Sequence, residues 1–198
     1  MLGLGAIAWI GWREAWAVAA RELQREAEAA AEYALRLVEG QLLAGDLADD
    51  LLRGLSDQAI RDHEGELHAA LKALRPRLPL VESVYVTDRE GRLLVTASRY
   101  PVPRDAVIAD VDWVSALASP TPSALHITKV YRGRIEDRLF YAISRPRTGS
   151  GNPPPAQGHD GAIHVTVDPN ALAAGLMALN GEPGDITALV RRDGAILV

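Results

Sequence analysis

The strongest constraint on the fold is a strand–turn–strand phrase that occurs twice along the chain. The complete copy spans residues 86–95 (VTDREGRLLV), and the second spans residues 190–198 (VRRDGAILV). In each copy an acidic residue precedes Gly91 or Gly194, and the glycine supplies the positive φ that a short hairpin needs. Because a half-built sheet cannot bury its face alone, we expect one complete α+β module at residues 80–182 and the truncated start of a second at residues 183–198.

Composition excludes several classes of function. The chain has 198 residues, no cysteine and a formal net charge of −5. An acidic chain without a dense run of lysine and arginine offers no field for a phosphate backbone, so we expect no nucleic-acid partner. The sequence also lacks a nucleophile elbow, a phosphate-binding glycine loop and an acidic calcium loop. We therefore expect no catalytic residue, no metal and no cofactor.

The one histidine pair that resembles a metal motif has the wrong spacing. His63 and His68 are five residues apart, whereas the zinc-protease helix places its histidines four apart so that both face one ion. Each helical residue turns by about 100°, so the second imidazole points away from the first. We interpret this stretch as solvated helix surface.

The N-terminal stretch is apolar but too short to cross a membrane. Residues 1–12 carry no charge and, as a helix, would extend about 18 Å against a hydrocarbon core of roughly 30 Å. Trp9, Trp12 and Trp16 stand where an aromatic belt would hold a helix at the lipid headgroups. We expect residues 1–16 to be the end of a transmembrane helix that begins outside this sequence. The alternatives are a signal-peptide core and an ordinary buried helix end.

Residues 17–79 are expected to be helical. No proline interrupts residues 9–43, and strong helix formers dominate there, which predicts one long helix that loosens at Gly40 and Gly45 before a short amphipathic turn at residues 46–55. The less polar positions of this helix alternate in steps of four and three like a coiled-coil seam: Trp16, Ala20, Leu23, Ala27, Ala30, Ala34 and Leu37. Two explanations remain open, a parallel homodimer and packing of the helix on its own domain.

A second helix and a sheet should follow. Ser56 is a typical N-cap, and Pro76 and Pro79 should end the helix that it begins. Runs of β-branched and aliphatic residues between turn residues predict strands at residues 81–87, 92–98, 124–131, 138–145 and 162–167. Short helices are expected at residues 111–118 and 169–180, and residues 149–161 should form a surface loop.

The last of these strands has two different faces. Side chains alternate with period two, so Ile163, Val165 and Val167 share one face while His164 and Thr166 share the other. The first set predicts a core face. The second set is either an exposed polar face or the lining of a small-molecule cavity, in which a histidine would titrate near neutral pH.

The order of motifs resembles a known family. The long helix is followed by the hairpin phrase, by Asp110-Val111-Asp112-Trp113-Val114, by a strand ending Ser144-Arg145, by Asp160-Gly161 and by Val167-Asp168-Pro169. This order is similar to that of the Cache, or PDC-type, extracytoplasmic sensor domains of bacterial histidine kinases and diguanylate cyclases. The terminal hairpin resembles the start of the membrane-proximal module in the double-Cache form.

The resemblance implies a PAS-like antiparallel sheet with the long helix on one side and a ligand pocket on the other. Val111 and Trp113 stand where the family pattern has arginine and tyrosine, and His164 stands where amino-acid-binding members have aspartate. Recognition of an amino acid is therefore not implied. The candidate ligand-binding residues, which would supply apolar walls and hydrogen bonds, are Asp110, Trp113, Tyr131, His164 and Thr166.

The sequence thus predicts a periplasmic domain of a bacterial inner-membrane signalling protein, which binds a small polar or anionic molecule and forms a homodimer through its helices. Two alternatives from other classes remain. One is a dimerisation and spacer module whose pocket binds nothing. The other is a soluble enzyme, for which the sequence offers no convergent nucleophile, base and oxyanion groups.

Overall fold

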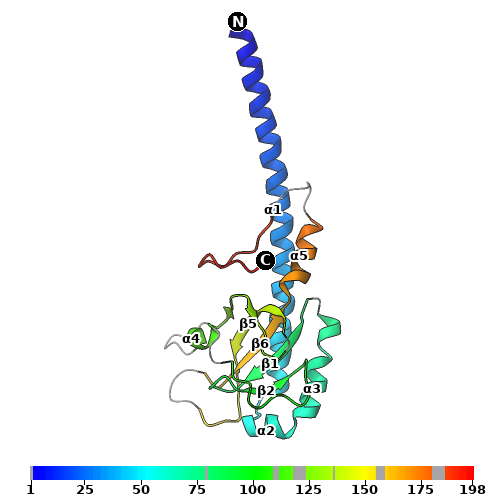
Figure 1. The fold of residues 1–198 in the computed structure, drawn as a ribbon, viewed down its shortest axis with the longest axis vertical. Helices are drawn as coiled ribbons and strands as arrows, with labels where there is room; N and C mark the ends of the chain where they lie inside the picture. Colours follow the sequence, from blue (N-terminus) through cyan, green and yellow to red (C-terminus); the bar gives the residue numbers. More distant parts are fainter. Residues whose placement is uncertain are drawn as a thin grey trace.

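The computed structural model describes residues 2–78, 80–108, 112–117, 124–135, 137–154, 159–179 and 186–198. Its dominant element is α1 (Leu2–Leu52), a single helix that rises far beyond the rest of the chain (Figure 1). The C-terminal part of α1 lies against the sheet, and the N-terminal part extends away from it. Among the described residues, no helix combines the length and the apolarity that crossing a membrane requires.

α1 continues through the glycines at which the sequence predicted it to loosen, so the separate turn expected at residues 46–55 is wrong. A Cβ atom at Gly45 would lie 3.3 Å from Cδ of Arg145 and 3.9 Å from Cγ2 of Val165, both on neighbouring strands. Ala44 and Ala48 are fully buried on the same stretch of helix. Gly45 therefore permits close packing of helix on sheet and does not end the helix.

Two short helices follow, α2 (Asp57–Asp62) and α3 (Glu64–Lys72). Ser56 caps α2 as predicted, because its Oγ accepts a hydrogen bond from the backbone N–H of Ala59 at 3.1 Å. The single helix expected here is divided at His63, whose φ of −104° and ψ of 20° leave the helical region. Pro76 lies in a 3-10 turn, η1 (Arg75–Arg77), that ends the helical segment, and Pro79 lies outside the described residues.

The described strands form one six-stranded antiparallel sheet, which confirms the predicted α+β class. Its order is β2-β1-β6-β5-β3, and β4 also pairs with β5, so β6 occupies the centre although it is last in sequence. The strands are β1 (Ser83–Thr87), β2 (Leu93–Thr96), β3 (His126–Ile127), β4 (Tyr131–Arg132), β5 (Leu139–Pro146) and β6 (Ala162–Val167).

The strand predicted at residues 124–131 is instead two short pieces, β3 and β4. Between them, the side-chain Oγ1 of Thr128 accepts a hydrogen bond from the backbone N–H of Ala142 at 2.8 Å. The backbone N–H of Thr128 still donates to the carbonyl of Ala142, at 2.9 Å. A hydroxyl thus takes the place of a backbone carbonyl, which interrupts the regular ladder.

The face of the sheet that α1, α2 and α3 cover is aliphatic. Ile163 and Val165 of β6 lie in the main core with Val84 and Val86 of β1, and Val167 lies in a second cluster with Tyr141. The predicted core face of residues 163, 165 and 167 is therefore confirmed. The helical side of the main core includes Ala44, Ala48, Leu52, Ile60, Leu67 and Leu71.

The C-terminal hairpin lies beside α1 and α5 (Pro169–Met177), above the sheet (Figure 1). Val190 and Ile196 form a single antiparallel bridge around Gly194, whose φ is 86°. Gly91 has a φ of 79° in the β1–β2 hairpin, so both predicted hairpins are present. Leu197 is 4% exposed and packs in the cluster that includes residues of α1, β5, β6 and α5.

The predicted seam of α1 is divided between two environments. Leu37 is buried in the chain's own core, and Ala30 packs against the same cluster. Trp16 and Leu23 are 61% and 58% exposed. Packing on its own domain therefore explains the C-terminal part of the seam and leaves the N-terminal part uncovered by the described residues.

Replacing Val165 by aspartate should prevent folding, because an unpaired carboxylate in the core costs several kcal/mol, a large part of a domain's stability. Val18 on the extended part of α1 is 49% exposed and offers the matched control, Val18→Asp, which should change the urea midpoint little. Circular dichroism during urea unfolding measures both. A cooperative transition of wild-type midpoint in Val165→Asp would show that the two faces of the sheet are assigned in reverse.

Candidate functional site

The face of the sheet opposite α1 is polar although it is buried. The strand register pairs Tyr85 with His164 and Ser83 with Thr166 between β1 and β6, and Ser144 with His164 between β5 and β6. All five side chains belong to residues that are at most 9% exposed. Buried hydroxyl and imidazole groups require hydrogen-bond partners, so this face is built either for internal pairing or for a ligand.

One end of the polar face is covered by α4 (Trp113–Leu117). Trp113 is fully buried, and its ring centroid lies 4.4 Å from that of His164. Leu117 and Ala162 complete this small cluster. Trp113 therefore packs directly over His164 on this part of the sheet.

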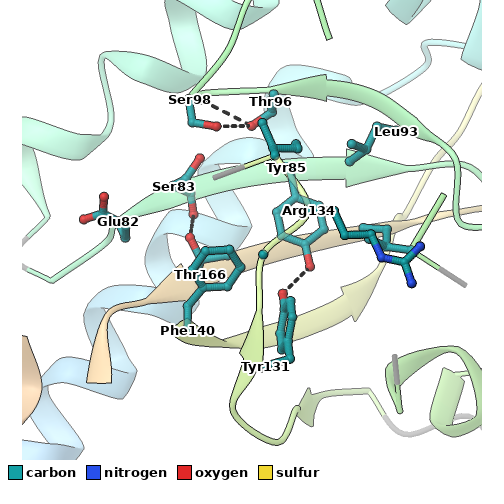
Figure 2. Close-up of a pocket in the computed structure, with 13 residues that line it drawn as sticks. Glu82, Ser83, Tyr85, Leu93, Thr96, Ser98, Tyr131, Arg134, Phe140 and Thr166 are labelled. Carbon is teal, nitrogen blue, oxygen red and sulfur yellow. Dashed lines mark hydrogen bonds between the residues drawn. The ribbon is translucent and has the colours of Figure 1, made fainter. Parts of the chain in front are cut away.

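A cavity lies at the other end of the polar face, between the sheet and the segments around residues 108 and 131–140 (Figure 2). The cavity volume is about 40 Å³. The empty space is about 470 Å³ when the part open to solvent is included. The lining residues are Glu82, Ser83, Tyr85, Leu93, Thr96, Ser98, Ile108, Tyr131, Gly133, Arg134, Ile135, Phe140 and Thr166. The cavity is thus a narrow cleft with aromatic and aliphatic walls.

Hydroxyl groups supply most of the polar atoms in this wall. The hydroxyls of Tyr85 and Tyr131 share a hydrogen bond of 2.8 Å, and Thr166 Oγ1 donates to the carbonyl of Ser83 at 3.0 Å (Figure 2). Thr96 Oγ1 and Ser98 Oγ are 3.1 Å apart. Ser83 Oγ is buried and has no hydrogen-bond partner within the described part of the chain. Ser83 also lines the cleft, so its hydroxyl is an unsatisfied buried polar group beside the cavity.

Burial keeps the two tyrosines uncharged. Desolvation raises the pKa of Tyr131 to about 12, and it raises the pKa of Tyr85 well above its ordinary value. A phenolate would lose its hydration in this environment, so the neutral hydroxyl is favoured. The Tyr85–Tyr131 pair can therefore donate and accept hydrogen bonds but adds no charge to the cleft.

His164 is held neutral behind the cleft. Its Nδ1 lies 2.8 Å from Ser144 Oγ, its Nε2 lies 3.1 Å from Thr87 Oγ1, and its ring is stacked on Tyr85 at 4.4 Å. Burial lowers the pKa of His164 well below its ordinary value, and the nearby His159 lowers it further. The expectation that this histidine titrates near neutral pH is therefore wrong, because burial disfavours the imidazolium.

The predicted site residues have different locations. Tyr131 and Thr166 line the cleft. Trp113, expected as an apolar wall, and His164, expected to supply a hydrogen bond, are buried beside each other and are not among the residues that line the cleft. Asp110 lies outside the described residues.

Several lining residues were not predicted. Ser83 and Tyr85 alternate in β1 with Val84 and Val86, which is the same period-two signal that identified His164 and Thr166. That signal was available in the sequence. Arg134 and Ile108 lie outside the named strands and reach the cleft only because the chain folds back over the sheet, so no local pattern indicates them.

An ion pair connects the start of α4 with the C-terminal hairpin. Asp112 Oδ2 accepts a hydrogen bond from Arg191 Nη1 at 2.7 Å and lies 3.3 Å from His126 Nε2. The backbone N–H of Lys129 also donates to this oxygen, at 3.3 Å. The segment that covers His164 is thereby fixed to β3 and to residues near the chain's C-terminus.

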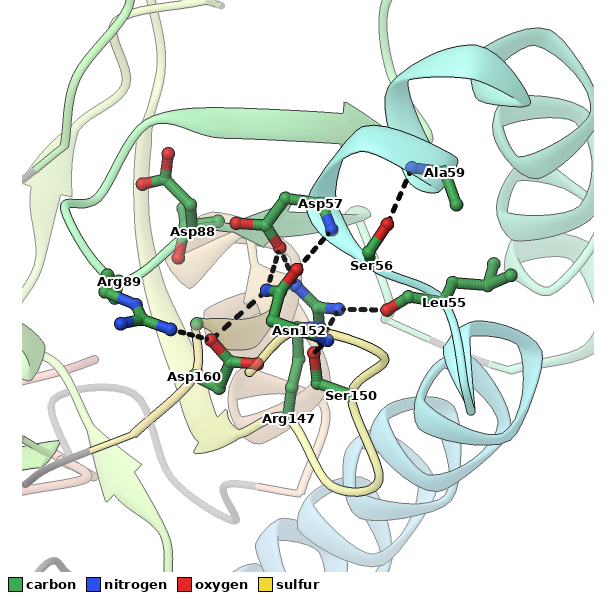
Figure 3. A network of polar contacts seen from close by, with 12 residues as sticks. Leu55, Ser56, Asp57, Ala59, Asp88, Arg89, Arg147, Ser150, Asn152 and Asp160 are labelled. Atoms are coloured by element: carbon green, nitrogen blue, oxygen red, sulfur yellow. Dashed lines mark hydrogen bonds and ion pairs between the residues drawn. The ribbon is translucent and has the colours of Figure 1, made fainter. Parts of the chain in front are cut away.

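A second polar cluster joins α2 to the loop after β5 and has a structural role (Figure 3). The buried guanidinium of Arg147 binds Asp57 Oδ1 at 2.6 Å and the carbonyl of Leu55 at 2.9 Å. Asn152 Nδ2 donates to Asp57 and to Asp160, and Arg89 binds Asp160 at 2.7 Å. These groups pair with one another, and the described residues contain no cluster of acidic, histidine or cysteine side chains arranged to hold a metal ion.

His164→Gln should make stability less dependent on pH. Burial lowers the folded pKa of His164 below the unfolded value, so the contribution of His164 to stability is complete above the unfolded pKa and is lost as the pH falls below it. Between about pH 7.5 and about pH 5.5 this loss is at most about 1.4 kcal/mol. Urea unfolding at the two pH values measures this difference. His63→Gln makes the same change at an exposed histidine, and equal pH dependence in wild type and His164→Gln would contradict a neutral, buried His164.

The fold is shared with bacterial sensor domains. No family model matches the sequence, and no curated protein is significantly similar to it. Among solved structures, the ligand-binding domain of Pseudomonas fluorescens chemoreceptor CtaA in complex with L-isoleucine is 18% identical with a TM-score of 0.60, over 86% of this chain and 64% of that one. The ligand-binding domain of Pseudomonas aeruginosa PAO1 chemoreceptor PctB in complex with L-Arg is 20% identical with a TM-score of 0.60, over 89% and 68%.

A histidine kinase provides a further match. The sensor domain of Vibrio cholerae DctB is 16% identical with a TM-score of 0.51, and the match covers 79% of this chain and 58% of that one. The chain therefore spans less than two thirds of CtaA's and of DctB's matched chains. At these identities the likeness establishes the architecture: the chain has the fold of the ligand-binding and sensor domains of bacterial chemoreceptors and histidine kinases, as its resemblance to Cache domains implied.

Proposed function

We propose that this chain is the extracytoplasmic small-molecule-sensing domain of a membrane-bound signal-transduction protein, a histidine kinase or a diguanylate cyclase. The chain itself binds and does not catalyse, and any kinase or cyclase activity resides elsewhere in the protein. The observation that supports this most is the cleft on the polar face, whose buried Ser83 hydroxyl has no partner among the described residues. A pocket with apolar walls and a few convergent polar groups is typical of small-molecule sites.

Solved structures with this fold support a binding role. CtaA is seen in complex with L-isoleucine and with L-serine, PctB with L-Arg, and PctC with GABA. These ligands belong to those proteins. For this chain they indicate that the fold accommodates small molecules.

The proposed signal passes from the cleft to α1 through β5 and β6. Thr166 lines the cleft from β6, while the neighbouring Val165 packs on the helix. At the end of β5, Arg145 pairs with Asp46 of α1, and the backbone N–H of Thr148 donates to Asp49 Oδ1 at 2.9 Å. A ligand that binds one arrangement of sheet and helix better than another shifts the population between them.

The proposed location is the periplasmic side of the bacterial inner membrane, with residues 1–16 forming the end of a transmembrane helix. Trp9, Trp12 and Trp16 are 57%, 61% and 61% exposed, and the guanidinium of Arg13 lies 5.3 Å from the ring of Trp9. Exposed tryptophans beside a cation suit the headgroup region of a bilayer. The C-terminal hairpin is proposed to begin a membrane-proximal module.

The second candidate function is a dimerisation and spacer module that binds no ligand. The small size of the cleft favours this spacer function, because the cavity volume is only about 40 Å³. Under both candidates the uncovered N-terminal part of the α1 seam pairs with a second copy, since apolar side chains such as Leu23 are otherwise left in water.

A metabolite that binds the cleft should raise the melting temperature of the domain, because a ligand bound only to the folded state stabilises it by about 2.7 kcal/mol at a hundredfold excess over Kd. Tyr131→Ala should abolish the shift, since it removes a wall and the hydroxyl bound to Tyr85. Tyr100 is 59% exposed and outside the cleft, so Tyr100→Ala should keep it. A broad metabolite screen without any shift favours the spacer, and a shift that survives Tyr131→Ala places binding elsewhere.

Glutamate at both Leu23 and Ala27 should abolish self-association, because these seam positions are exposed in the single chain and a charged seam cannot pack. Analytical ultracentrifugation measures the association. Glutamate at both Val18 and Leu35, which are exposed but outside the seam, is the control and should leave a dimer intact. Survival of the dimer in the seam variant, or its loss in the control, would contradict pairing through this face.

A further inference from the structure

One wall of the cleft offers hydroxyl groups to a ligand's head, from buried Ser83, Thr96 and Thr166 and from exposed Ser98. Thr96 of β2, Ser83 of β1 and Thr166 of β6 lie on one face of three adjacent strands, and Ser98 follows beside Thr96 (Figure 2). Each hydroxyl can donate one hydrogen bond and accept two. Ser83 Oγ is the member without a partner among the described residues, and its residue is 9% exposed. We call these four residues the hydroxyl row.

The carboxylate beside the hydroxyl row is already paired. Glu82 Oε2 lies 3.2 Å from Arg75, and Glu82 Oε1 lies 3.3 Å from Arg138. Since both oxygens face guanidinium groups, a ligand ammonium would have to displace an arginine or share its partner. A ligand carboxylate at the row would lie beside Glu82, whose side chain is 18% exposed, whereas the two arginines are 57% and 58% exposed and screened by solvent.

The rest of the buried surroundings adds no charge. Tyr85 and Tyr131 are neutral hydroxyls bound to each other, and His164 behind Tyr85 is a neutral imidazole. Arg134 also lines the cleft, but it is exposed to solvent and its guanidinium donates to the carbonyl of Val107. Burying an ion without an opposite charge costs several kcal/mol, whereas a neutral hydroxyl or carbonyl needs only the hydrogen bonds that the row supplies.

We propose that the cleft selects a ligand with an uncharged hydrogen-bonding head and an apolar body, and that it rejects amino acids and other charged small molecules. The head lies at the hydroxyl row and bonds to Ser83 Oγ. The body lies between Leu93, Ile108, Ile135 and Phe140. This inference rests on the proposed sensing function and defines the chemical class of its ligand.

Three probes of equal length test the head group: hexanol, hexanoate and hexylamine. At neutral pH they share an apolar body and carry a neutral, a negative and a positive head. Isothermal titration of the folded domain should show hexanol binding at least about tenfold more tightly than either ion, because each ion pays a desolvation cost that the row does not offset. L-isoleucine, tested in the same way, should not bind.

Two conservative variants test the row. Ser83→Ala and Thr166→Val remove one hydroxyl each with little change of shape, and each should weaken hexanol binding by about threefold to tenfold through the loss of a neutral hydrogen bond. Thr148 follows β5, is exposed, lies outside the lining and donates its hydroxyl to Asp49. Thr148→Val is therefore the matched control and should bind hexanol like wild type. Urea unfolding of each variant verifies that the domain still folds.

The outcomes separate this inference from the proposed function. Binding of hexanoate or hexylamine as tightly as hexanol overturns the uncharged head, and so does unchanged hexanol affinity in both row variants. L-isoleucine binding that Tyr131→Ala abolishes also overturns it, while leaving a sensing domain. If hexanol does not bind, the inference fails, and the metabolite screen alone then decides between sensor and spacer.

Discussion

The structure depends on the double burial of its central strands. Every residue of β1 and β6 is buried, so the side chains on both faces of these strands are shielded from water. On the α1 side, aliphatic burial at about 25 cal/mol per Å² provides the main stabilisation. On the other side, hydroxyl and imidazole groups contribute little net free energy when they are paired and cost more than they contribute when they are not. The face that stabilises the fold and the face that lines the candidate site are therefore opposite faces of the same strands.

Burial moves the titratable groups of the polar face toward their neutral forms. The pKa values of Tyr85 and Tyr131 rise and that of His164 falls, in each case chiefly through desolvation. Around neutral pH the face therefore presents dipoles and aromatic rings without charge. Interactions made there respond weakly to salt, unlike those of the ion pairs on the surface.

The features predictable from sequence are those with a local cause. Gly91 and Gly194 form their turns because glycine readily adopts the positive φ that each turn requires. Ser56 caps the helix that follows it directly, and the period-two alternation of β6 determines which of its side chains face the core. The features that were missed depend on residues far away in sequence. Gly45 lies within a continuous helix, where its lack of a side chain allows close packing on Arg145. Thr128 interrupts a strand because its hydroxyl accepts the hydrogen bond from the backbone N–H of Ala142.

The candidate site follows the same division. Alternation placed His164 and Thr166 on the polar face, but only the path of α4 determines that Trp113 covers His164 while Thr166 stays at the cleft. Tyr131 was expected on a regular strand and reaches the cleft from a short piece that pairs with β5. Which polar groups on a face meet solvent-filled space is a property of the covering segments, and these have no periodic pattern.

The Asp112–Arg191 ion pair makes the order of two distant segments mutually dependent. Seating α4 over the sheet fixes the carboxylate that holds Arg191, and placing the hairpin fixes the guanidinium that holds Asp112. The entropy lost in ordering one segment is then partly spared for the other. By thermodynamic linkage, ordering of the hairpin favours the seating of α4 by the same coupling free energy by which the seating of α4 favours ordering of the hairpin.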